Sequence, residues 1–101
     1  MKKLILVTLF SIAGLMAADG ATLYKTCMAC HGANGDKVPP GSKATFTINS
    51  LKKEKIIEDL KGYKAGTLNQ YGLGVQMKIY AGKLSDADMS ALADYIVTLK
   101  K

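Results

Sequence analysis

The side chains best suited to chemistry lie together in the segment CMACHG, residues 27–32. It contains both cysteines, Cys27 and Cys30, and the only histidine, His31. Positions three and four apart share one face of a helix, so the three side chains would project to the same side. Two thiols at this spacing, followed directly by an imidazole, form the attachment pattern of c-type haem, in which the histidine binds iron. The segment therefore predicts one covalently bound haem held by Cys27, Cys30 and His31.

Other uses of two cysteines and a histidine fit the sequence less well. A thioredoxin-like redox motif begins a helix after a buried strand, whereas this motif ends a helical pattern that no strand precedes. A closed zinc site needs a fourth ligand, usually Cys or His, and the chain has no further residue of either type. A disulfide between Cys27 and Cys30 would close too short a loop to stabilise the fold much. Haem attachment is therefore the favoured interpretation.

The second axial ligand of the iron has to come from elsewhere in the chain. A sulfur donor would suit electron transfer, whereas an open position would suit a haem-based sensor or ligand-binding module. Of the five methionines, Met1 and Met16 lie in an apolar N-terminal segment, Met28 lies within the attachment motif, and Met89 fits the apolar stripe of the last predicted helix. Met77, which follows a flexible glycine-containing stretch, is therefore the predicted ligand. A packing role for Met77 is the alternative.

The first residues, MKKLILVTLFSIAGLMA, have the pattern of a secretory signal peptide, with two lysines, an apolar run and then small residues. The apolar run is shorter than the roughly 20 residues that span a membrane, and an uncleaved membrane anchor is the alternative. We expect residues 1–17 to be removed by cleavage after Ala17. Residues 18–101 would then form a single exported domain in a periplasm.

The mature chain is short and basic. Its 84 residues can bury only a small core unaided, so a prosthetic group would add to its stability. The formal charge is +6, and it becomes +4 when Lys2 and Lys3 are removed. All basic residues are lysines, and no arginine-rich or aromatic-interleaved stripe appears, so nucleic-acid binding is not expected. The surplus of lysines instead favours steering toward an acidic redox partner.

Apolar periodicity predicts an all-α fold. It indicates helical segments at residues 20–31, 51–64, 75–82 and 85–99, whereas an apolar alternation at residues 44–48 has no partner strand. Ser50 is a suitable N-cap for the second segment, and Ser85 with Asp88 resembles a capping box at the start of the last. The connecting loops amount to roughly a third of the mature chain, which suggests that they wrap around a large apolar object.

These features resemble the small class I c-type cytochromes of bacteria, especially the cytochrome c-553 group. Besides CMACH, the resemblance rests on KGYKAG at residues 61–66, VQM at 75–77 and KLSDADMSALADYIVTLK at 83–100. It implies a small class I cytochrome c fold of about four helices around one haem. It also implies that the first and last helices cross at Gly20, beside Tyr24 and Tyr95, and that a carbonyl of Pro39 or Pro40 accepts the second ring N–H of the haem histidine.

The predicted function is that of a soluble periplasmic monohaem carrier of single electrons between partner proteins, and not of an enzyme. We expect a monomer whose only membrane contact is through a membrane-bound partner or an uncleaved signal. Tyr63, Asn69 and Tyr71 could donate hydrogen bonds to a haem propionate or near the Met77 sulfur, and surface or core roles for them remain open. The rival functions are the haem-based sensor and a disulfide oxidoreductase.

Overall fold

The computed structural model describes residues 19–99, and all regular structure in that range is helical. The elements are α2 (Gly20–Tyr24), α3 (Met28–His31), the 3₁₀ helix η1 (Ile48–Ser50), α4 (Lys53–Ala65), α5 (Gly74–Ala81) and α6 (Asp86–Val97). The all-α prediction is therefore confirmed. The predicted signal peptide and its cleavage site after Ala17 lie outside the described residues. Within residues 19–99, no helix has the length and apolar character needed to cross a membrane.

The first predicted helix is interrupted. Residues 20–31 were expected to be continuous, but α2 ends at Tyr24 and α3 begins at Met28. Between them the Cys27 N–H donates to the Tyr24 carbonyl at 2.9 Å, three residues back, and the Thr26 hydroxyl donates to the Leu23 carbonyl at 3.3 Å. A threonine hydroxyl that takes a backbone carbonyl competes with the α-helical pattern. The prediction of one helix was wrong here, because it followed the apolar spacing alone.

The start of α4 also differs from the prediction. Ser50 does not cap this helix, because it belongs to η1 and its hydroxyl donates to the Thr47 carbonyl at 2.6 Å. The N-cap position is held by Lys52, which makes no side-chain capping bond. The alternation at residues 44–48 leads into η1 and forms no strand within the described chain. A serine hydroxyl that hydrogen-bonds within its own turn is therefore not available to cap the helix that follows.

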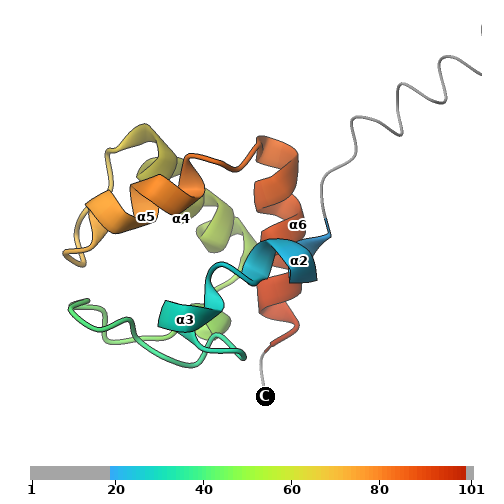
Figure 1. Cartoon of the computed structure of the whole chain (residues 1–101), viewed down its shortest axis with the longest axis horizontal. Coiled ribbons are helices and arrows are strands. Elements are labelled where there is room, and N and C mark those ends of the chain that lie inside the picture. Colours follow the sequence, from blue (N-terminus) through green and yellow to red (C-terminus); the bar gives the residue numbers. More distant parts are fainter. Residues whose placement is uncertain (1–18, 100–101) are drawn as a thin grey trace, which may run out of the picture.

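The N-terminal and C-terminal helices cross at close range. A Cβ on Gly20 would lie 2.9 Å from the Cβ of Tyr95, so only glycine allows α2 to approach α6 this closely. Beside the crossing, the rings of Tyr24 and Tyr95 lie with their centroids 5.6 Å apart. Figure 1 shows α2 lying across the middle of α6. The crossing implied by the cytochrome resemblance is present.

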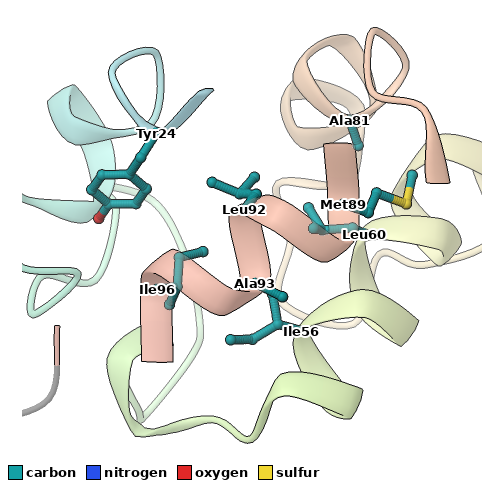
Figure 2. Packing of buried hydrophobic residues seen from close by; sticks show 8 residues of the cluster. All are labelled: Tyr24, Ile56, Leu60, Ala81, Met89, Leu92, Ala93 and Ile96. Atoms are coloured by element: carbon teal, nitrogen blue, oxygen red, sulfur yellow. The ribbon is translucent and has the colours of Figure 1, made fainter. Parts of the chain in front are cut away.

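The last helix supplies half of the buried core residues. The predicted capping box is formed, with Ser85 Oγ accepting from the Asp88 N–H and the Asp88 carboxylate accepting from the Ser85 N–H. The inner face of α6 packs against α2 and α4, and Ala81 of α5 joins the same cluster (Figure 2). The buried side chains are Tyr24, Ile56, Leu60, Ala81, Met89, Leu92, Ala93 and Ile96. Partly buried side chains of the loops, among them Leu51 and Leu84, also pack against this core.

Candidate functional site

A large cavity lies between α3 with its following loop and the helices α4 and α5. Water-sized molecules could occupy about 150 Å³ of it, roughly ten times the volume that one buried water needs. Some residues of each of the segments 26–31, 37–51, 56–63 and 71–80 contribute to its wall, together with Leu92 and Ile96 of α6, and the wall is almost wholly apolar. The long loops therefore do surround a space suited to a large apolar group.

Both thiols of the attachment motif line this cavity. Cys27 is half-buried, Cys30 is exposed, and no disulfide joins them. Burial raises the pKa of the Cys27 thiol, and the hydroxyl of Thr26, 3.9 Å from the sulfur, opposes that rise only in part. Disulfide oxidoreductases depend on the reverse, a thiol whose pKa is lowered. The surroundings of Cys27 therefore argue against the oxidoreductase alternative.

His31 lies at the end of α3 and lines the same cavity. Its N–H donates to the Cys27 carbonyl at 2.9 Å, the four-residue spacing of an α-helix, so the break after α2 leaves the relation of cysteine and histidine intact. Burial lowers the pKa of His31, which leaves its imidazole neutral near pH 7, the form that binds metals. The chain leaves α3 through Gly32, whose φ of 83° favours glycine.

The expected bond from the histidine to a proline carbonyl is not formed. Nδ1 of His31 is buried and has no hydrogen-bond partner among the described residues. Pro39 lines the cavity and is half-buried, whereas Pro40 is exposed and does not line it. The Pro39 carbonyl accepts the Ser42 N–H at 3.0 Å, which closes a turn of the loop. That turn places Pro39 near the site without bringing its carbonyl to the imidazole.

The three methionines of the described chain have different surroundings. Met89 is fully buried in the core between α6 and its neighbours, as predicted, and Met28 is exposed. Neither lines the cavity. Met77, on α5, is half-buried and does line it. In Figure 1, α3 and α5 lie apart, so the cavity receives His31 and Met77 from separate parts of the fold.

The three polar residues near the predicted site have separate positions. Tyr63 and Tyr71 both line the cavity, and the Tyr71 ring meets the Phe46 ring edge-on with centroids 5.2 Å apart. Asn69 does not line the cavity. Its Oδ1 accepts the Gly74 N–H at 2.7 Å, so it holds the start of α5 and acts on Met77 only through the backbone.

Several cavity residues were not anticipated from the sequence, although the helical spacing contained a signal for some of them. Asp59 lies three residues after Ile56 and four before Tyr63, which puts all three on one face of the helix predicted over residues 51–64. Leu73 and Tyr80 share the spacing of Met77 in the same way. The loop residues gave no such signal, since they meet the cavity only through tertiary folding. They include Lys37, Ser42, Ala44 and Phe46.

Two thiols, an imidazole and a thioether on the wall of one apolar cavity define a class of small helical proteins that enclose a flat metal-bearing cofactor. The sequence model for cytochrome c matches residues 17–100. The chain is 37% identical over 90 residues to cytochrome c-553 of Nitratidesulfovibrio vulgaris, covering 89% of this chain and 85% of that protein.

Two further relatives span nearly the whole chain. Identity is 40% over 103 residues with cytochrome c-553 of Helicobacter pylori, covering 99% of this chain and all of that protein. It is 31% over 103 residues with cytochrome c-552 of Hydrogenobacter thermophilus, again covering 99% of this chain and all of the relative. The chain belongs to the cytochrome c family.

Membership of this family establishes the small class I cytochrome c fold and covalently bound haem c as the cofactor. The residues present fit that group. The C-x-x-C-H motif supplies two thiols and a neutral imidazole, and the apolar wall matches the large apolar face of a porphyrin. The predictions of fold and cofactor made from the sequence are thereby confirmed.

Proposed function

We propose that this protein is an exported monohaem carrier of single electrons, with His31 and Met77 as the axial ligands of its haem iron. The family membership already supports a monohaem electron carrier. The haem supplies the couple between ferrous and ferric iron, and the protein binds, orients and tunes it. Cys27 and Cys30 would form the two thioether bonds, and the cavity wall would exclude water from most of the ring.

One observation carries the assignment of Met77: among the three methionines of the described residues, it alone lines the cavity. A thioether there would raise the reduction potential relative to a second nitrogen ligand. It would also fill the sixth position, which distinguishes a carrier from a haem-based sensor. No carbon monoxide should therefore bind readily to the reduced protein at neutral pH.

The ligation is tested by Met77→Ala in the haem-loaded protein. The haem should stay attached through its cysteines, while the iron becomes high-spin or water-ligated and its potential falls. The visible absorption spectrum and a redox titration measure both effects. Met89→Leu is the matched control, because it replaces a core methionine by a side chain of similar volume away from the cavity and should leave the spectrum unchanged. An unchanged low-spin spectrum in Met77→Ala would move the ligand to another residue.

A partner with an acidic surface would complete the proposed function. Residues 60–85 contain Lys61, Lys64, Lys78 and Lys83 but no aspartate or glutamate. On α5, Val75 is 73% exposed and Ile79 58% exposed, close to the half-buried Met77. Exposed apolar side chains among lysines suit a small, short-lived contact with an acidic surface. We take α5 as the centre of that contact.

Export is tested by the intact mass of protein matured in a host that attaches haem to secreted cytochromes. The mass should equal residues 18–101 plus one haem, since we expect cleavage after Ala17. A mass that includes residues 1–17 would indicate an uncleaved anchor. A mass without haem would contradict the whole proposal.

A further inference from the structure

A single carboxylate lines the haem cavity among the described residues, that of Asp59 on α4. Its side chain is only 15% exposed, and an aspartate this deeply buried is usually paired with a positive charge. It lies on the same face of α4 as Ile56 and Tyr63, which also line the cavity. A charge at this place is weakly screened by solvent and therefore acts on neighbouring groups over a longer distance than a surface charge.

The partner of Asp59 lies outside the cavity. Nζ of Lys55 is 3.1 Å from Asp59 Oδ1 and 3.2 Å from Glu58 Oε1. Neither Lys55 nor Glu58 lines the cavity, and Glu58 is 73% exposed. The hydrogen bonds to Asp59 and then to Glu58 raise the pKa of Lys55, which keeps the lysine charged. The ion pair thus presents its negative member to the cavity and its positive member to solvent.

The other polar groups on the cavity wall do not cancel this charge by contact. Lys37 lines the cavity from the loop after α3 and forms no ion pair within the described chain. Tyr63, one turn after Asp59, has a raised pKa caused first by its burial and then by the Asp59 charge. The phenol beside the carboxylate therefore stays neutral, and the negative charge on this wall belongs to Asp59.

We propose that Asp59 tunes the cofactor electrostatically, lowering the midpoint potential of the haem, and that Lys55 limits the size of this effect. The inference rests on the proposed electron-carrier function. Ferric haem carries one more positive charge than ferrous haem, so a nearby carboxylate favours the ferric state. The ammonium of Lys55 has the opposite sign and lies further from the cavity, so it reduces the effect without reversing it.

The test compares Asp59→Asn with Glu58→Gln in the haem-loaded protein by spectroelectrochemical titration at pH 7. Each substitution removes one negative charge that pairs with Lys55, but only Asp59 faces the cavity. Asp59→Asn should raise the ratio of reduced to oxidised protein at a fixed solution potential about threefold. That ratio corresponds to a shift of about 28 mV, since tenfold is about 59 mV for a one-electron couple.

The shift in Asp59→Asn should persist at high salt, because the carboxylate is largely buried, whereas Glu58→Gln should move the potential little at any salt concentration. An equal shift in the two variants, or none in Asp59→Asn, would overturn the inference. A low-spin spectrum in wild-type protein tests the electron-carrier function separately, so failure of one is not mistaken for failure of the other. If Asp59→Asn yields no haem-loaded protein, the test uses Lys55→Gln instead. This variant should lower the midpoint potential of the haem more than Lys52→Gln does. Equal shifts of the midpoint potential in the two lysine variants would overturn the proposal.

Discussion

A tyrosine outside the attachment motif fixes the backbone at the haem histidine. Tyr24 is fully buried, and its hydroxyl donates to the Gly32 carbonyl at 2.6 Å, directly after His31. The Lys37 N–H donates to the His31 carbonyl at 3.1 Å from the other side. These two hydrogen bonds fix the backbone at His31 and Gly32, and thereby the position of the imidazole. The aromatic ring that packs α2 on α6 thus also positions the motif.

Removing this hydroxyl should lower stability without loss of packing. Tyr24→Phe deletes one buried hydrogen bond, worth about 1 kcal/mol, and should lower the Tm of the haem-loaded protein by about 5 °C. Thermal unfolding followed by circular dichroism measures it. The matched control is Tyr95→Phe, because the Tyr95 ring contacts the Tyr24 ring but its hydroxyl has no hydrogen bond among the described residues. Equal losses in the two variants would contradict the role assigned to the Tyr24 hydroxyl.

The role of the Tyr24 hydroxyl in stability can also be tested by varying the pH. Burial raises the pKa of Tyr24 from 10.0 to about 12. Because the folded pKa is raised, the contribution of the neutral phenol is fully present below pH 10 and is lost as pH rises toward 12. The Tm difference between wild type and Tyr24→Phe should therefore shrink above pH 10. A difference that stays constant to pH 12 would mean that folding does not raise the pKa of this phenol.

At the scale of the elements, periodicity and caps were enough to predict α5 and α6. The capping box of Ser85 and Asp88 and the apolar stripe of α6 are local features, and the structure contains both. Local competition explains the errors. Thr26 and Ser50 each use a hydroxyl on a nearby carbonyl, which breaks the first predicted helix and removes the expected cap of α4. Apolar spacing carries no information about such bonds.

In the candidate site, too, the residues set by local spacing could be predicted and those set by tertiary folding could not. The spacing of Cys27, Cys30 and His31 is set within one helical turn, so the sequence alone predicted that they lie together, and the structure places all three on the cavity wall. Met77 could be chosen only by eliminating other methionines, and the structure adds the reason, since it places this side chain on the cavity wall. The position of Pro39 and the turn that occupies its carbonyl depend on the path of a loop. No periodic pattern describes that path.

At the scale of the whole molecule, charge is distributed unevenly along the chain. The stretch from residue 60 to residue 85 has lysines and no carboxylates, whereas α6 begins with Asp86 and Asp88. Lys78 lies on α5 beside Ile79, and its Nζ would be 3.1 Å from a Cβ on Gly66, at the C-terminal end of α4. Lys78 and Lys64, which is in the last turn of α4, therefore both lie where α5 meets the end of α4. Their positive charge should attract anions to the surface around α5.

Small ions of opposite charge can measure this field without knowledge of the natural partner. Oxidation of the reduced protein by hexacyanoferrate(III) should slow as salt is added, and oxidation by the cation hexaamminecobalt(III) should quicken. Lys78→Gln should lower the first rate about twofold at low ionic strength and leave it unchanged near 1 M salt, where the Debye length is about 3 Å. Stopped-flow absorption measures these rates.

The control for position is Lys52→Gln at the opposite end of α4. Thirteen residues of α4 separate the two ends, a distance of roughly 20 Å at 1.5 Å per residue. Loss of the Lys52 charge should therefore change the rate with hexacyanoferrate(III) much less than loss of the Lys78 charge. Equal effects of the two substitutions would show that only the net charge of the molecule matters. Electrons would then not pass preferentially through the face formed by α5.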